Sequence, residues 1–361
     1  MSLVIFILLL TLLIVVHELG HFSVAKFFNI KVEEFGVGFP PRLLKVQKGE
    51  TTYSLNLLFF GGFVKIFGEN HNEAANNPRS FAAKPRLVQA AVVVAGIVMN
   101  LLFAWLALSV GYMVGIPASA QHRGFGTVEN QKVLVVGLVS GSPAMKSGVL
   151  PEDQVTAIAT AATVGPTNPD ADAVRGFIAA HQDESIILSV DRAGAQKTFV
   201  LRAESGLIDG RKAVGVQLDD VGTLKLPVHL ALAQGAILAY DMILSTAQGL
   251  GLFFYQIVRG SADFGSVAGP IGIAGIGAKA VQSGFQAAVT LVALISINLA
   301  IINLLPIPGL DGGRLLIIVI EGIFRRPVPE KLSLAITLVG FALLITLMLV
   351  VSYHDIARLI G

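Results

Sequence analysis

Four long apolar stretches constrain this chain more than any other feature of its sequence. They cover about residues 3–25, 87–115, 287–305 and 332–352. Each is long enough to cross the core of a bilayer as a helix, which takes roughly 20 residues. The composition agrees, since 14% of the residues are charged, against about 25% in soluble domains. The sequence therefore predicts a polytopic α-helical membrane protein with four transmembrane helices.

A fifth apolar stretch, residues 228–258, is ambiguous. Polar residues recur in it every seven positions and would form a stripe along a helix, as on a helix that lies on the membrane surface. Two loops, residues 26–86 and 314–331, are rich in Lys and Arg, so the positive-inside rule makes both cytoplasmic. Four spans satisfy this rule and a fifth span would break it. We therefore expect residues 228–258 to be interfacial.

The first apolar stretch ends in the sequence HELGH, residues 17–21. His17 and His21 lie one helical turn apart and share a face, so both can bind one cation. H-E-x-x-H is a zinc signature in which the glutamate, here Glu18, is the general base. An ionisable group at the centre of a span costs about 2.5–3.5 kcal/mol, which favours a functional explanation. The simpler alternative is that the three side chains snorkel from the end of the helix.

A catalytic zinc also needs a third protein ligand. The chain has no cysteine, and its other histidines lie in polar regions or near the ends of apolar runs. Asp311, in NLLPIPGLDG, is predicted to lie at the same membrane depth as the two histidines. Pro306 and Pro308 cannot continue a regular helix, so this stretch is suited to present Asp311 to a polar cavity. The alternatives are a turn in which Asp311 is only a helix cap, and Asp241 as the third ligand.

These motifs resemble those of the site-2 protease family, in particular bacterial zinc intramembrane proteases of regulated intramembrane proteolysis. The resemblance covers nearly the whole chain. HELGH matches H-E-x-x-H, NLLPIPGLDG matches N-x-x-P-x-P-x-L-D-G, and AGIVMN matches A-G-P-x-x-N except that Ile97 replaces the proline. The resemblance implies one zinc ion per chain, bound by His17, His21 and Asp311, with Glu18 as the catalytic base.

The resemblance also implies where a substrate binds. Residues 51–69 alternate in polarity around Gly61-Gly62 and predict strands or a hairpin. In the family this region is a membrane-associated β-hairpin that can pair with an extended substrate by β-augmentation. An ordinary hairpin that covers the site is the alternative. The expected substrate-binding residues are Asn303, Gly61, Gly62, Phe63, Pro306 and Pro308.

Two further asparagines, Asn100 and Asn298, lie inside apolar stretches. We interpret them as residues that hydrogen-bond one helix to another, which is the commoner role of an asparagine in a membrane helix.

Residues 118–226 are polar and differ from the rest of the chain. They contain short strand-like runs (KVLVVGLV, SIILSV and KTFVLRA) and a helical stretch near residues 170–181. The segment from Gly141 to Asp153 resembles a bacterial PDZ domain, and we expect an inserted extracytoplasmic PDZ-like α+β domain. The Asp-Gly or Asn-Gly turn that usually follows the next strand is missing. Peptide binding and a simple size filter therefore both remain open.

The expected organisation has four parts. Residues 1–117 form a first membrane half with the HELGH helix, a cytoplasmic β element and the second span. Residues 118–226 form the PDZ-like domain, and residues 227–286 form an interfacial amphipathic helix and a gate segment. Residues 287–361 form a second membrane half with the LDG motif and the last span.

The expected function is zinc-dependent cleavage of peptide bonds within transmembrane segments, in regulated intramembrane proteolysis. Substrates would be of the anti-sigma factor or signal-peptide-remnant type, in the bacterial inner membrane. Other expected partners are the lipid bilayer and a ligand of the PDZ-like domain, while the net charge of +2 gives no indication of a nucleic acid. One alternative is a catalytically silent membrane adaptor. Another is an ion transporter, which should carry more paired carboxylates in its spans.

Overall fold

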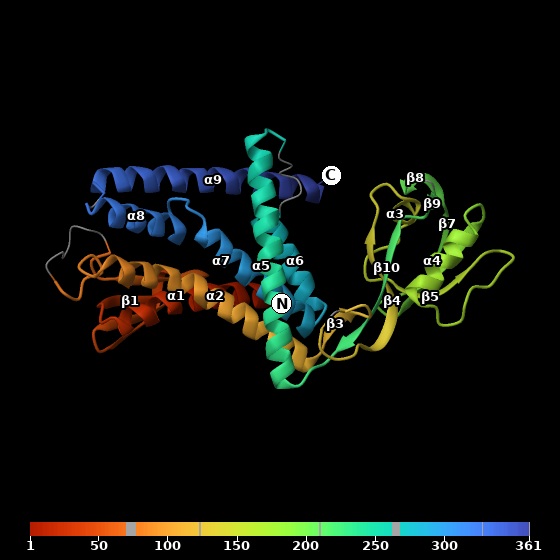
Figure 1. The fold of residues 1–361 in the computed structure, drawn as a ribbon, viewed down its shortest axis with the longest axis horizontal. Helices are drawn as coiled ribbons and strands as arrows, with labels where there is room; N and C mark the ends of the chain where they lie inside the picture. The colour runs from red at the N-terminus through yellow and green to blue at the C-terminus, as the bar shows by residue number, and fades with distance from the viewer. Residues whose placement is uncertain (70–76, 123, 209–210, 262–267, 327, 361) are drawn as a thin grey trace. The chain divides into compact units, whose positions relative to one another are not determined.

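The computed structural model describes residues 1–69, 77–122, 124–208, 211–261, 268–326 and 328–360 (Figure 1). The chain divides into two compact units. The first, which we call the membrane unit, consists of residues 1–111 and 232–361. The second, which we call the inserted unit, consists of residues 112–231.

Helices dominate the membrane unit. Among the described residues, five helices are long and apolar enough to cross a membrane, which supports a multi-pass membrane protein. They include a helix over residues 228–258, so the predicted count of four spans is not confirmed. The helices are α1 (Ser2–Phe27), α2 (Arg86–Val114), α5 (Val228–Val258), α6 (Pro270–Gln282), α7 (Phe285–Leu304), α8 (Asp311–Phe324) and α9 (Glu330–Ile360).

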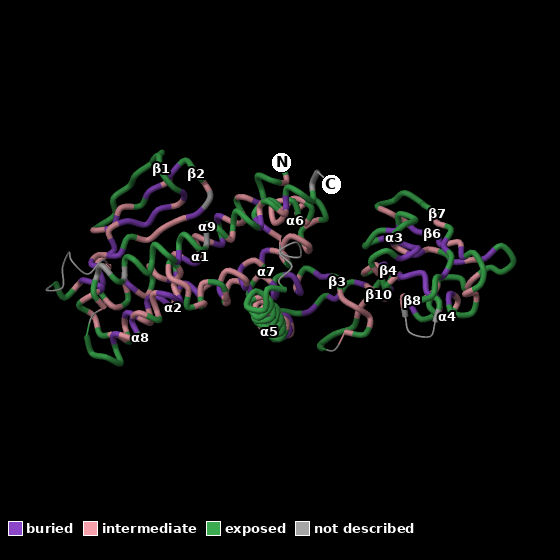
Figure 2. Tube along the Cα trace, turned by 90° about the horizontal axis from the view of Figure 1, so that it is seen from above, coloured by how far each residue is buried: buried purple, intermediate pink, exposed green. Residues whose placement is uncertain are grey.

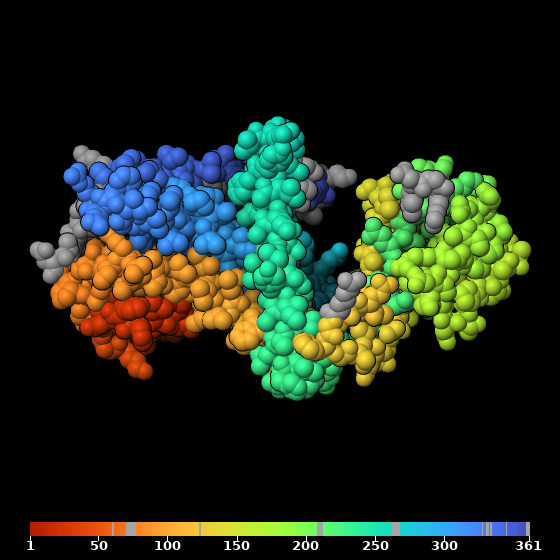
Figure 3. All heavy atoms as spheres, viewed as in Figure 1, coloured from red at the N-terminus to blue at the C-terminus, as the bar shows by residue number. Residues whose placement is uncertain are grey.

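Helix α5 runs across the helices that it contacts rather than alongside them (Figures 1 and 2). Ala239 packs in one cluster with Leu108 of α2 and Ile297 of α7. The indole nitrogen of Trp105 donates a hydrogen bond to the carbonyl oxygen of Leu232, at 2.9 Å. Most side chains beyond this crossing point are exposed, and Figure 3 shows much of the helix at the surface.

A two-stranded sheet lies between α1 and α2 in the sequence. It consists of β1 (Val32–Lys48) and β2 (Thr51–Ile66), which are antiparallel and joined by a turn at residues 49–50. The predicted strand is confirmed in β2, and Gly61 and Gly62 lie within this strand rather than at the turn. Here β1 bends, so that its first part pairs with residues 62–66 and also with residues 52–55 of β2.

This sheet lies against α1 over more than one helical turn. The hydroxyl of Thr11, which has one proton to donate, lies within hydrogen-bonding distance of the carbonyl oxygens of Ile7 and Phe59. At the opposite end of the sheet, Glu50 accepts hydrogen bonds from Arg79 and Lys26. These bonds lower the pKa of Glu50 to about 2. The sheet is therefore fixed beside α1 at both of its ends.

The inserted unit contains a six-stranded sheet and a closed apolar core. Its strand order is β3-β10-β4-β5-β6-β7, with every neighbouring pair antiparallel. The predicted strand-like runs and the predicted helix are confirmed, in β4, β6, β7 and α4. The elements are β3 (Ile116–Ser119), β4 (Glu129–Leu138), α3 (Pro143–Lys146), β5 (Gln154–Ala159), α4 (Ala171–Ala180), β6 (Ser185–Arg192), β7 (Ala195–Arg202), β8 (Glu204–Ile208), β9 (Arg211–Ala213) and β10 (Val216–Leu224).

The predicted gate segment, residues 266–278, is described only in part. Its first two residues lie outside the described residues, and most of the remainder forms α6. The carboxylate of Asp355, in α9, accepts hydrogen bonds from the backbone N–H groups of Gly269 and Gly272. It therefore caps the N-terminus of α6.

Candidate metal and catalytic centre

The HELGH residues lie in the C-terminal half of α1, which continues without a break from Ser2 to Phe27. The regular helix brings the two imidazoles to one face, as their spacing predicts. The Nε2 atoms of His17 and His21 are 3.1 Å apart. The side chain of His17 is 9% exposed and that of His21 is 12% exposed. These polar rings are therefore almost fully buried.

Asp311 is the first residue of α8 and follows an irregular loop after α7. Gly309 supplies a left-handed residue in this loop, with a φ of 96°. The first turn of α8 packs directly on the loop backbone, because a Cβ on Gly312 would lie 2.2 Å from the carbonyl oxygen of Leu305. The loop and the glycines after Asp311 together fix the start of α8, and with it the carboxylate.

The structure brings both histidines and Asp311 together, although about 290 residues of sequence separate them. The Oδ2 atom of Asp311 lies 2.9 Å from Nε2 of His17 and 3.3 Å from Nε2 of His21. Tetrahedral zinc with ligands at about 2.0–2.1 Å places its ligand atoms about 3.3 Å from one another. Three atoms this close, each able to offer a lone pair, fit a single zinc ion.

Helix α2 completes the surroundings of the two histidines. The Nδ1 atom of His21 is 2.8 Å from the carbonyl oxygen of Val92, which can only accept a hydrogen bond. Nδ1 of His21 must therefore carry the proton, which leaves the lone pair on Nε2 toward Asp311. A Cβ on Gly96 would lie 2.5 Å from Nε2 of His21 and 2.8 Å from Cε1 of His17. Only glycine leaves room for both rings at this position.

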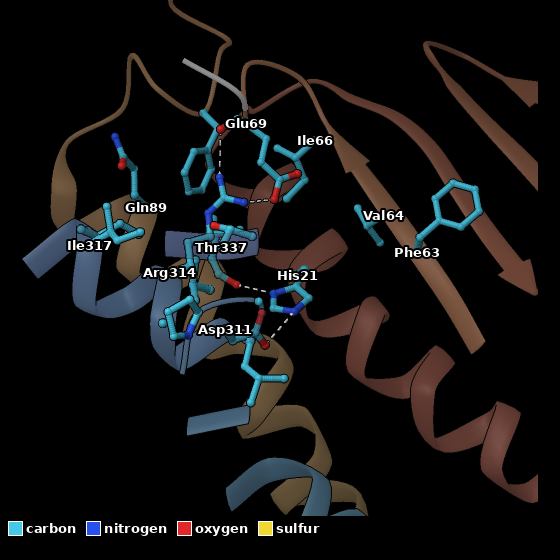
Figure 4. Close-up of a pocket in the computed structure, with 18 of the residues that line it drawn as sticks. His21, Phe63, Val64, Ile66, Glu69, Gln89, Asp311, Arg314, Ile317 and Thr337 are labelled. Carbon is cyan, nitrogen blue, oxygen red and sulfur yellow. Dashed lines mark hydrogen bonds and ion pairs between the residues drawn. The ribbon is translucent and has the colours of Figure 1, made fainter. Parts of the chain in front are cut away.

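Two cavities adjoin the cluster. The larger has a volume of about 850 Å³ and is lined by segments of α1, β2, α2, α8 and α9 (Figure 4). The smaller has a volume of about 240 Å³ and is lined by residues of α1, α2, α7 and the loop before α8. His17, Glu18 and Asp311 line both cavities. Glu18 therefore lies where a water molecule beside the cluster would be within reach.

Charged side chains line the larger cavity away from the histidines. Arg314 donates hydrogen bonds to the carboxylate and the carbonyl oxygen of Glu69, which follows β2 (Figure 4). Arg86 of α2 pairs with Glu321 of α8 at 2.7 Å. These pairs connect α8 to β2 and α2 and give the cavity a polar wall that can admit water.

Four of the six predicted substrate-binding residues lie close to the cluster. Phe63 and Pro308 line the larger cavity and Asn303 lines the smaller one. A Cβ on Gly62 would lie 3.6 Å from Cγ of Glu18. The other two, Gly61 and Pro306, line neither cavity.

The alternative ligand Asp241 does not belong to the cluster. It is exposed on α5, and the three-residue group of His17, His21 and Asp311 does not include it. Of the remaining histidines, His71 lies outside the described residues, and none of the others joins this group.

Sequence reasoning quoted the AGIVMN motif and gave Asn100 an interhelical role, but it did not assign the residues of α2 to the surroundings of the histidines. Val92, Gly96 and Asn100 are four residues apart, so they share one helix face. The spacing of Gly96 and Asn100 was a usable signal. The contribution of Val92 is a backbone carbonyl, for which a sequence contains no signal.

These membrane helices and this histidine–carboxylate cluster define a membrane metallopeptidase. Residues 5–347 match the model of Peptidase family M50, and the chain belongs to this family. The expected metalloendopeptidase of the site-2 protease type is thereby confirmed, as is zinc as its cofactor.

Relatives cover the chain almost end to end. A protein of Clostridium perfringens named as a zinc metalloprotease is 33% identical, over 95% of each chain. Zinc metalloprotease RasP of Geobacillus kaustophilus is 27% identical, over 99% of this chain and 98% of its own. A chloroplastic membrane metalloprotease of Arabidopsis thaliana, ARASP2, is 30% identical, over 97% of this chain and 78% of its own.

Proposed function

We propose that this protein cleaves peptide bonds within transmembrane segments of other membrane proteins, with His17, His21 and Asp311 as zinc ligands and Glu18 as the general base. One observation carries the proposal. Three potential ligand atoms from the two ends of the chain lie within 4.8 Å of one another, on helices apolar enough to span a membrane. Such a buried polar cluster has no role in helix packing that would offset its cost in a bilayer.

Each residue of the cluster has a distinct role in this reaction. His17, His21 and Asp311 would hold the zinc ion, which would supply a Lewis acid able to polarise the peptide carbonyl and to lower the pKa of water. Glu18 takes a proton from the attacking water and passes it to the leaving nitrogen. The larger cavity, with its charged wall, gives water access to Glu18.

The edge of β2 supports a transmembrane helix as the substrate class. Such a helix must unwind before cleavage, because its peptide bonds are enclosed in its own hydrogen bonds. Residues 62–64 pair with β1 on one side, and among the described residues no further strand pairs with them on the other. An unwound substrate can add to this free edge by β-augmentation, beside Glu18. Asn303, in the wall of the smaller cavity, then holds the substrate backbone.

The resemblance of the motifs to regulated intramembrane proteases supports the biological setting. We place the protein in the bacterial inner membrane, with the cluster near the cytoplasmic side and residues 118–226 outside the cytoplasm as a PDZ-like domain. In this arrangement α5 lies on the membrane surface, which its crosswise direction favours. Substrates of the anti-sigma factor or signal-peptide-remnant type fit a site that accepts single transmembrane helices.

Glu18→Gln tests the proposal. The change removes the base but leaves the three ligands, so we expect the purified protein to keep its full zinc content and to cleave a model transmembrane substrate much more slowly. The residual rate should be lower by at least about 100-fold. Equal cleavage by the variant and wild type would contradict the role of Glu18. Zinc without cleavage in both would favour a silent adaptor or a transporter.

A further inference from the structure

We propose that Asn100 is a positioning residue for the metal, which accepts the Nδ1 proton of His17 through its side-chain oxygen. The role depends on the zinc site proposed above and adds a residue to it. Asn100 acts through His17 and does not touch the metal.

The surroundings of Asn100 leave one of its atoms without a partner. Its side chain is fully buried on α2. Its Nδ2 atom is 3.4 Å from Nδ1 of His17. Its Oδ1 atom is buried and has no hydrogen-bond partner among the described residues. A buried acceptor without a partner is unfavourable, so this arrangement needs a physical explanation.

Metal binding requires the opposite orientation of this amide. If Nδ2 donated to Nδ1 of His17, the ring proton would lie on Nε2, which faces Asp311, and Nε2 could not bind a cation. Rotating the side-chain amide of Asn100 by half a turn exchanges its Oδ1 and Nδ2 atoms, which are nearly equal in size. Oδ1 then accepts Nδ1–H of His17, and the lone pair of Nε2 is free for the metal.

The neighbouring histidine already shows this arrangement. Nδ1 of His21 lies 2.8 Å from the carbonyl oxygen of Val92, two helical turns before Asn100 on the same face of α2. Histidines that bind a metal usually donate their second ring N–H to such an acceptor. Helix α2 therefore supplies one acceptor for each histidine, with Gly96 leaving space for both rings between them.

A purely interhelical role for the Asn100 side chain is less favoured. The hydroxyl of Ser296, in α7, donates a hydrogen bond to the main-chain oxygen of Asn100 at 2.8 Å. The contact between α2 and α7 at this position therefore uses the backbone of Asn100, and its side chain remains for His17. Ser296→Ala is consequently a matched control, because it weakens the helix contact without changing the surroundings of His17.

The test measures zinc affinity of the full-length protein in detergent, by competition with a chromophoric chelator. We expect Asn100→Leu, which has no acceptor, to weaken zinc binding by about 10–100-fold. Asn100→Asp keeps an acceptor and should stay close to wild type, as should Ser296→Ala. The visible absorption spectrum of the Co²⁺-loaded protein should change in the leucine variant only.

Three results would overturn the proposal. They are unchanged zinc affinity in Asn100→Leu, weakened affinity in Asn100→Asp, and an equal loss in Ser296→Ala. The Tm of each metal-free variant shows whether it folds, and if the leucine variant does not fold, the aspartate variant decides the question. A wild-type protein that binds no zinc would instead contradict the proposed function.

Discussion

Buried polar side chains of the inserted unit hold turns, whereas several of those in the membrane unit meet at one point. Ser142 caps α3 by accepting a hydrogen bond from Met145, and Asp153 accepts one from the backbone of Leu150. Thr160 accepts hydrogen bonds from the backbone in the turn that follows β5. Each of these side chains accepts a hydrogen bond from a backbone N–H group in its own neighbourhood, so each has a role in local structure.

The membrane unit has no such local explanation for His17, Asn100 and Asp311. They come from three helices; His17 and Asp311 line both cavities, and Asn100 lines the smaller one. In a bilayer, lipid competes with protein for apolar side chains, so burying a polar group there requires a stronger reason than in water. The difference between the units identifies the functional site before any motif is considered.

Removing the Asp311 carboxylate should have the largest effect on this contrast. Loss of a residue that only hydrogen-bonds to a metal ligand lowers metal affinity by up to roughly 100-fold. Asp311→Ala removes a ligand itself, so we expect a larger fall in zinc affinity and the loss of cleavage. Zinc content and proteolysis of the purified protein measure both effects. Asp241→Ala is the matched control, because that aspartate is exposed on α5, outside the cluster. Loss of zinc in Asp241→Ala but not in Asp311→Ala would make Asp241, and not Asp311, the third ligand.

Adding a side chain at Gly96, where α2 contacts the histidines of α1, should have the next largest effect on activity. The Cβ of Gly96→Ala would lie within 3 Å of both imidazoles, so the rings must move. A shift of about 1 Å in an active site can reduce the rate by about 100-fold, and we expect a loss of that size in kcat. Gly249→Ala in α5 is the control, since a Cβ there meets nothing within 4 Å. Equal activity of the two variants would show that the histidines are not held by α2.

A change in the inserted unit should affect stability and leave the metal site intact. Asp153 is buried and binds Arg192 through both carboxylate oxygens, at 2.6 and 2.7 Å. We expect Asp153→Ala to destabilise this unit by about 1–3 kcal/mol, because Arg192 and the N–H of Leu150 lose their acceptor. Hydrogen exchange of the full-length protein measures this effect. Asp183→Ala, at an exposed ion pair, should be close to neutral.

The stabilisation that Asp153 provides through Arg192 and Leu150 should depend on pH. Burial raises the pKa of Asp153, but the hydrogen bonds from Arg192 and Leu150 have the greater combined effect and leave it below its ordinary value of 3.8. The folded pKa therefore lies below the unfolded one, so the stabilisation is complete above pH 3.8 and is lost as the pH falls through the folded pKa. The stability difference between wild type and Asp153→Ala should narrow below that pH. A constant difference would show that the charge of Asp153 is unimportant.

The sequence predicts most of the helices because the bilayer imposes a length and a composition on them. It also predicts that His17 and His21 share a face, because four residues make about one turn. The sequence did not predict β1, because Pro40, Pro41 and several charged residues interrupt its alternation of polar and apolar residues. Its partner, β2, also follows only after a turn. The proximity of Asp311 to the histidines is a tertiary contact. The predicted membrane depth and the motif suggest it, but it depends on the three-dimensional fold.

The coordination shell of the bound zinc tests the central claim most directly. X-ray absorption spectroscopy of zinc-loaded Glu18→Gln should find two imidazole nitrogens and at least one oxygen at about 2.0–2.1 Å. The same measurement on a variant that also carries His21→Ala should lose one imidazole. A shell with fewer than two imidazoles, or one that the second substitution leaves unchanged, would contradict a zinc site built from α1 and Asp311.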